Sequence, residues 1–173
     1  MLVTINTDAS FSQEFKIGSY AFWIVCNSGR FLKSGSFREQ VENPTLAEMK
    51  CIINALHCLK KQGWTGIDKI IINTDSLNGI HIFKKDKNHI LKYRIKYGKS
   101  LSHKFDQVTK ELPLIEFRHV KAHTTTEKAR SWVNDWCDKA AKELLRKEVK
   151  NKKNEYRIIA ARLAESGTLA GGN

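Results

Sequence analysis

The first part of the chain alternates hydrophobic and polar residues with a period of two, which is the pattern of strands that face a core on one side. Residues 2–8 follow this pattern, and two further segments that we expect to be strands occupy residues 19–27 and 29–39. The turn sequence Asn-Ser-Gly at 27–29 separates these two segments. The order predicts three consecutive strands that form an antiparallel meander.

From Asn43 onwards the apolar residues recur at intervals of three and four, which predicts an amphipathic helix that continues to Gly63. Asn43 is the expected N-cap, and Pro44 lies in the expected first turn. Residues 68–75 follow as a short, almost continuously apolar strand, of the kind that is buried on both faces in the parallel part of a sheet. A strand, a helix and a second strand make a crossover unit.

The second half of the chain predicts helical pieces around a basic middle over residues 77–112 and a fifth strand over 114–123. A long helix is expected from about Thr124, where a capping-box pattern begins, to about Lys150. The expected fold class is therefore α/β, with a five-stranded mixed sheet whose first three strands are antiparallel and with helices packed on both faces.

Composition indicates one domain with a polyanionic partner. A length of 173 residues with 41% hydrophobic content fits one domain, which we expect over 1–150, followed by a basic extension over 151–173 that is partly helical or disordered. Thirty Lys and Arg against eighteen Asp and Glu give a formal charge of +12, which favours nucleic acid as partner.

The chain shows no sign of a membrane-bound or disulfide-bonded protein. Its longest apolar run, residues 20–26, is too short to span a bilayer, and no signal segment opens the sequence. We therefore expect a cytoplasmic or nuclear protein without membrane association. The four cysteines form no CxxC pair and no ligand cluster with histidine, so we expect reduced thiols, most of them in the core.

The phrase Ile-Asn-Thr-Asp occurs twice, at 5–8 and at 72–75, each time at the expected end of an apolar strand. Ligands of parallel α/β sheets bind where strands end, so Asp8 and Asp75 share one crevice if the two strands are neighbours. Such a pair repels unless one group is protonated or both share a cation, and oxygen ligands favour Mg²⁺ or Mn²⁺. A single Asp at a strand end more often caps a turn, but the repetition favours a site.

Two helices offer further carboxylates. Glu48 lies at the edge of the apolar stripe of the first helix, although Thr45-x-x-Glu48 also has the form of a capping box, and the sequence does not decide between the two. On the last helix, Asp138 lies at the edge of the apolar face, whereas Asp135 is expected to face solvent. The predicted cluster can therefore include up to four carboxylates.

Five blocks of the sequence resemble, in the same order, those of cellular (type 1) ribonuclease H: NTDAS, PTLAEMKCIINAL, INTDSLNGI, VKAH and NDWCDKAAKEL. The resemblance covers most of the chain. It implies the ribonuclease H fold and an endonuclease that cleaves the RNA strand of RNA/DNA hybrids, leaving 5′-phosphate and 3′-hydroxyl ends. It also implies that two Mg²⁺ ions, for which Mn²⁺ can substitute, bind Asp8, Glu48, Asp75 and Asp138. His123 matches the histidine that assists proton transfer or product release in the family.

The predicted substrate contacts depart from the family's pattern. Where relatives carry a Gly/Asn/Pro-rich turn after the first strand, this chain has FSQEFKIG, and Asn43-Pro44-Thr45 replaces an amide-rich sequence before Glu48. The candidates that are left are Ser10, Asn43, Thr45 and Ser76. A basic segment also resembles the protrusion that grips the DNA strand in some relatives; it contains Lys84, Lys85, Lys87, Lys92, Arg94, Lys96, Lys99 and Lys104.

Three functions stay open from the sequence. The leading one is a ribonuclease H that acts as a monomer on an RNA/DNA hybrid duplex. The altered contact residues also permit a structure-selective DNA endonuclease, such as a junction resolvase, on the same fold. The third is a binding module without catalysis, which is disfavoured because a repulsive carboxylate cluster without metal destabilises a domain.

Overall fold

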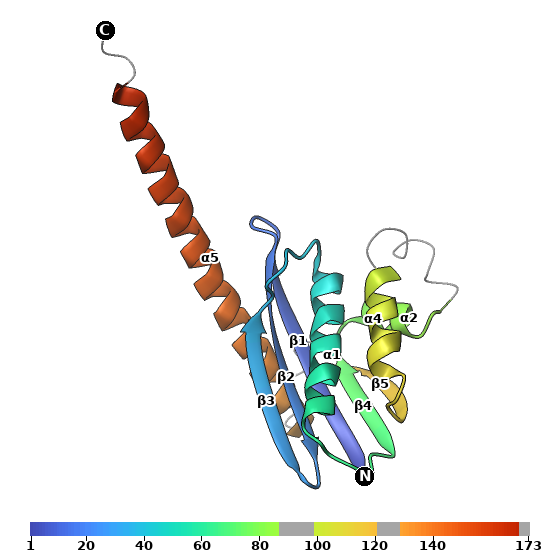
Figure 1. Cartoon of the computed structure of the whole chain (residues 1–173). Helices are drawn as coiled ribbons and strands as arrows, with labels where there is room; N and C mark the ends of the chain where they lie inside the picture. The colour runs from blue at the N-terminus through green and yellow to red at the C-terminus, as the bar shows by residue number, and fades with distance from the viewer. Residues whose placement is uncertain (87–98, 121–128, 170–173) are drawn as a thin grey trace.

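The structure is a computed structural model that describes residues 1–86, 99–120 and 129–169 (Figure 1). Its mixed sheet has the strand order β3-β2-β1-β4-β5. The first three strands pair antiparallel, and β4 pairs parallel with both β1 and β5. The predicted meander and mixed sheet are therefore confirmed. The strands are β1 (Leu2–Ser12), β2 (Ile17–Cys26), β3 (Gly29–Ser36), β4 (Lys69–Thr74) and β5 (Leu114–His119).

Helices cover both faces of the sheet, as predicted. Phe22 of β2 packs in the main core with residues of α1 and α4, whereas the adjacent Trp23 packs against Cys137 of α5. Because successive strand residues point to opposite faces, α1 and α5 lie on opposite sides of the sheet. The helices are α1 (Pro44–Lys61), α2 (Leu77–Phe83), α4 (Lys99–Thr109) and α5 (Ala129–Leu169).

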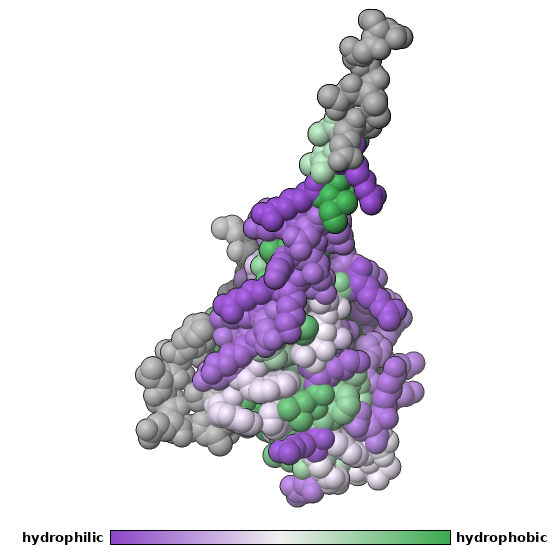
Figure 2. Space-filling model, turned by 90° about the vertical axis from the view of Figure 1, so that its left-hand side faces the viewer, coloured by the Kyte–Doolittle hydropathy of each residue, from purple (hydrophilic) through white to green (hydrophobic). Residues whose placement is uncertain are grey.

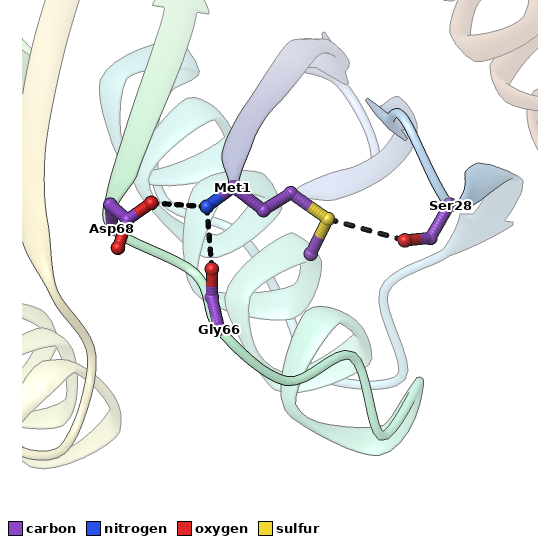
Figure 3. Close-up of polar contacts among 4 residues, drawn as sticks. All are labelled: Met1, Ser28, Gly66 and Asp68. Carbon is purple, nitrogen blue, oxygen red and sulfur yellow. Dashed lines mark hydrogen bonds and ion pairs between the residues drawn. The ribbon is translucent and has the colours of Figure 1, made fainter.

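The start of β1 is tied to the segments on both sides of it (Figure 3). The Met1 ammonium donates to the carbonyl oxygen of Gly66 and forms an ion pair with Asp68, just before β4. The Met1 sulfur accepts a hydrogen bond of 3.3 Å from the Ser28 hydroxyl, at the turn between β2 and β3. These contacts hold the beginning of β1 beside β4.

The predicted end of β1 at residue 8 is wrong. Pairing with β4 ends at Asn6 opposite Asn73, but pairing with β2 continues to Ser12 opposite Ile17. The hairpin with β2 therefore keeps β1 extended beyond its parallel neighbour. Asp8 lies inside β1 rather than at its end, yet it lies past the point where β4 stops.

The start of α1 resolves the open question about Glu48. Asn43 is the N-cap, because its Oδ1 accepts a hydrogen bond of 3.0 Å from the backbone N–H of Leu46. Pro44 is the first helical residue, where its missing N–H costs nothing. The helix thus begins before Thr45, and the capping-box interpretation of Thr45 and Glu48 is wrong.

The last helix, α5, is 41 residues long and continues well past residue 150 (Figure 1). Its final part projects away from the sheet, where the large side chains of Tyr156, Ile158, Ile159 and Leu163 are 51–66% exposed. On the face shown in Figure 2, mostly hydrophilic side chains cover the part of α5 nearer the sheet. The segment 151–169 is therefore helical rather than disordered, which agrees with its content of good helix formers. Of the helices described, none is both long and apolar enough to cross a membrane.

Candidate metal centre

The two copies of Ile-Asn-Thr-Asp lie side by side where the parallel strands separate. Asn6 and Asn73 are register partners, and the Asn73 side-chain amide donates a hydrogen bond of 2.9 Å to Asn6 Oδ1. Both residues are buried, so this bond satisfies polar groups inside the sheet. Directly after it, β4 ends and Asp75 follows. The repeated phrase is therefore explained by two neighbouring strands that close on the same edge of the sheet.

Asp8 lies on the face of the sheet that α5 covers. Its register partner in β2 is Ala21, and directly opposed residues share a face. Ala21 packs against Cys137, the residue before Asp138 in α5. Asp138 is half-buried beside the cluster, and its charge contributes to the raised pKa of Asp8.

Glu48 approaches the same place from α1. Its Oε1 accepts a hydrogen bond of 2.8 Å from the backbone N–H of Ala9, which lies beyond the last residue of β1 that pairs with β4. Within the part of the chain that the structure describes, Glu48 Oε2 is the buried side-chain polar atom without a hydrogen-bond partner. A buried carboxylate oxygen without a partner is costly, and a bound cation removes that cost.

The carboxylates are close enough to share a cation. One oxygen from each of Asp8, Glu48 and Asp75 can be chosen so that all three lie within 4.8 Å of one another. Burial, followed by the charges of Asp75 and Asp138, raises the pKa of Asp8 to about 7. Burial and the charges of Asp8 and Asp75 also raise the pKa of Glu48 well above its ordinary value. In the metal-free protein, the charged form of this cluster is therefore disfavoured.

Asp138 is not part of that close group, and a lysine pairs with it. Lys142 Nζ lies 2.7 Å from Asp138 Oδ1 and 2.8 Å from Oδ2, one helical turn further along α5. The Lys142 charge also acts to lower the pKa of Asp8. The sequence reasoning did not consider Lys142, although its spacing of four from Asp138 on a helix is the signal that identifies it. Asp135, by contrast, is exposed as predicted.

Two buried thiols support the strand beneath the cluster. Cys51 of α1 donates to the Asp8 carbonyl oxygen at 3.4 Å, and Cys137 of α5 donates to the Asn6 carbonyl oxygen at 3.7 Å. The two helices lie on opposite faces, so β1 is held from both sides at the residues that carry the site. All four cysteines are free thiols, and burial raises the pKa of both Cys51 and Cys137.

Asp75 has a further neighbour that the sequence reasoning missed. His119, the last residue of β5, places Nε2 at 3.1 Å from the backbone carbonyl oxygen of Asp75. An Nε2–H tautomer donates this hydrogen bond and fixes the backbone of Asp75. His123, the histidine predicted from the sequence, lies outside the described residues.

The structure describes some of the predicted substrate contacts but not all of them. Asn43 and Ser76 cap α1 and α2, each accepting a hydrogen bond from a backbone N–H, and Ser10 and Thr45 are half-buried. Lys84 and Lys85 are exposed at the end of α2, and Lys85 forms an ion pair of 2.9 Å with Asp106. The other predicted contacts, Lys87, Lys92, Arg94 and Lys96, lie outside the described residues. Substrate contact by these residues stays a prediction.

Comparison with known proteins matches this chain to the model of the RNase H family over residues 2–159. No curated protein matches the sequence. The fold is similar to the N-terminal RNase H domain of rv2228c from Mycobacterium tuberculosis, with 14% identity, a TM-score of 0.66, and coverage of 87% of this chain and 98% of that one.

Two further solved structures share the fold. RNase H1 from the archaeon Halobacterium salinarum is 15% identical with a TM-score of 0.61, covering 85% of this chain and 99% of that one. LC11-RNase H1, solved in complex with an RNA/DNA hybrid, is 18% identical with a TM-score of 0.64 and covers the same shares. The structural neighbours thus agree with the family match.

Proposed function

Because the chain belongs to the RNase H family, we propose that it is a divalent-metal-dependent endonuclease that hydrolyses the RNA strand of RNA/DNA hybrids. The products would carry 5′-phosphate and 3′-hydroxyl ends. The observation that carries the proposal is the convergence of Asp8, Glu48 and Asp75, with a buried Glu48 oxygen that has no hydrogen-bond partner in the described chain. The hybrid bound to LC11-RNase H1 supports the substrate class.

The donor set fits Mg²⁺ or Mn²⁺, because these hard cations prefer carboxylate oxygens with water completing the shell. Asp8, Glu48 and Asp75 would hold the first ion, and Asp138 would complete a two-ion site after release from Lys142. Bound divalent ions activate a water molecule and stabilise the leaving 3′ oxygen during phosphodiester hydrolysis.

Hydrogen bonds from other residues of the chain orient the metal ligands. The Ala9 N–H fixes Glu48 Oε1, which leaves the buried Oε2 for a cation, and His119 fixes the backbone of Asp75. Without a cation, the carboxylates would repel the phosphates of a substrate, so cleavage depends on the metal. All four carboxylates come from one chain, which supports action as a monomer. His123 would assist proton transfer or product release.

Cleavage of three labelled substrates tests the proposal. An RNA/DNA hybrid, matched duplex DNA and matched duplex RNA would each be incubated with Mg²⁺, Mn²⁺ or EDTA. We expect the RNA strand of the hybrid to be cut with either metal, and no cutting in EDTA. Cleavage of duplex DNA with the hybrid left intact would instead identify a DNA endonuclease, and binding without any cleavage would identify a binding module.

A further inference from the structure

A groove with a volume of about 780 Å³ extends over the outer side of α1, between the end of β3 and α4. Its floor is apolar, because it includes Ile53, Leu101 and Val108, which are nearly inaccessible to solvent. Its sides are basic, and the one acidic residue among the described lining residues is Glu39. The cationic and titratable lining residues are Arg38, Lys50, His57, Lys60, Lys61 and Lys104.

The groove is separate from the metal centre, although α1 contributes to both. Lys50, His57 and Lys61 are spaced by seven and four residues, which places them in one stripe along the helix. Lys50 follows Glu48 by two positions, or roughly 200° around the helix, so the stripe points away from the carboxylates. Lys61 lies roughly 20 Å along the helix axis from Glu48.

Lys104 belongs to this groove rather than to the basic segment after α2. Asp106, which forms the ion pair with Lys85, follows Lys104 by two positions on α4. Residues two apart on a helix point in directions that differ by roughly 200°. Lys104 and the Lys85–Asp106 ion pair therefore lie on different faces of α4. The basic residues that are consecutive in the sequence thus divide between two surfaces.

Part of the positive charge in the groove is not neutralised by the described residues. Lys50 pairs with Glu39 at 3.3 Å and Lys60 pairs with Glu111 at 2.9 Å, and both acids are more than three-quarters exposed. Arg38, Lys61 and Lys104 form no ion pair with any residue in the described ranges. Cations gathered in a concave site with an apolar floor focus a positive field outward.

We propose that this α1–α4 groove binds the sugar–phosphate backbone of a nucleic acid, as a second contact outside the catalytic crevice. The stripe from Lys50 to Lys61 is roughly 16 Å long, which is the length of several phosphates rather than one, at roughly 3.4 Å per nucleotide of a strand. The inference rests on the proposed function for the identity of the partner. A substrate longer than the crevice would place its flanking backbone in the groove.

Metal-free binding removes the contribution of the metal centre, because the carboxylate cluster without a cation repels phosphate, and substitutions in the groove then separate its share from that of the other basic surfaces. A labelled hybrid several helical turns long would be titrated in EDTA at several salt concentrations, using fluorescence anisotropy. The groove variant is Lys61→Gln with Lys104→Gln. The matched control is Lys33→Gln with Lys139→Gln, which removes equal charge at exposed positions outside the groove.

We expect the groove variant to bind more weakly and to lower the slope of log affinity against log salt by about 2, one unit for each lost phosphate contact. The control variant should change the slope little, and all variants should melt at similar temperatures. Equal slopes in the two variants would overturn the proposal. The proposal would also be overturned if the groove substitutions abolished binding of inorganic pyrophosphate but left hybrid binding unchanged.

The assay separates this proposal from the proposed function. If the hybrid is never cleaved but only the groove variant loses affinity, the groove proposal stands and the enzymatic proposal fails. If the hybrid is cleaved with metal but the groove variant retains the slope of the unsubstituted protein, the groove proposal alone fails.

Discussion

The metal centre and the α1–α4 groove share one helix, but they are built in opposite ways. At the metal centre, packed structure fixes two of the carboxylates: Glu48 is 8% exposed and bonded to Ala9, and Asp8 lies in a strand held from both faces, whereas Asp75 is exposed. In the groove, the charges sit at the ends of long, accessible side chains over an apolar floor.

The difference predicts how each region responds to substitution. A close cluster of like charges around a buried carboxylate works as a unit, so one altered member changes the whole site. Exposed cations that contact phosphates contribute separately, so their loss is graded and depends on salt. The following substitutions test that contrast, from the largest expected effect to the smallest.

Asp75→Asn should lower hybrid cleavage by on the order of a thousandfold or more, because a neutral amide binds a divalent ion poorly. Hybrid binding in EDTA should be retained, since the basic surfaces are unchanged. Cleavage rates and anisotropy measure the two effects. Asp135→Asn is the matched control, because Asp135 is an exposed residue of α5, and it should leave cleavage and binding unchanged. A comparable loss of cleavage in this control, or full activity in Asp75→Asn, would contradict the assignment of Asp75 as a metal ligand.

Glu48→Gln should weaken Mn²⁺ binding by about a hundredfold, measured by calorimetry, because the site loses a charged ligand. The side-chain oxygen that accepts from Ala9 is kept. The metal-free protein should become more stable to urea, because a buried carboxylate is removed from a repulsive cluster. Glu111→Gln, at an exposed position, should change neither quantity. Destabilisation by Glu48→Gln in EDTA would show that Glu48 has a structural role instead.

The stability of the metal-free protein should fall as pH rises from about 4 to about 7, by on the order of 2 kcal/mol. Asp8 has a pKa of about 7 when folded and an ordinary value of 3.8, so the folded state binds more protons in this window. Urea unfolding in EDTA at several pH values measures the trend. Asp8→Asn should flatten it, whereas stability that increases through this window would contradict the raised pKa.

Lys142→Met should strengthen Mn²⁺ binding severalfold, because the ammonium competes with the metal for Asp138. Lys139→Met removes the same charge from an exposed position on α5 and should have a smaller effect. Calorimetric titration compares the two variants. Weaker binding in Lys142→Met would mean that the lysine positions Asp138 for the metal rather than opposing it.

Much of the fold could be predicted because its signals are local. The alternation of β1 to β3, the period of α1 and the apolar run of β4 each follow from neighbouring residues. The end of β1 could not be predicted in this way, because residues 9–12 stay extended through pairing with β2 and not through their own pattern. The sequence did not decide whether residues 151–169 are helical or disordered, because these residues favour helix but have few contacts to hold them.

The candidate site was predictable where one residue type was repeated at a structural boundary, as at Asp8 and Asp75. The role of Glu48 could not be decided from the sequence. Its position on the helix predicted that it lies near the sheet, but only the observed N-cap at Asn43 excluded a capping box. Contacts made through backbone atoms, such as those of His119, left no signal in the sequence. The groove was hidden because its cations come from α1, α4 and the loop before α1, and only the fold brings them together.

Calorimetric titration of Mn²⁺ into the unsubstituted protein and into Asp75→Asn, without nucleic acid, tests the central claim most directly. The claim is that Asp8, Glu48 and Asp75 form a cation site in the folded chain. We predict saturable binding to the unsubstituted protein, accompanied by proton release, and its loss in the variant. Equal binding by the two proteins, or none by either, would contradict the account.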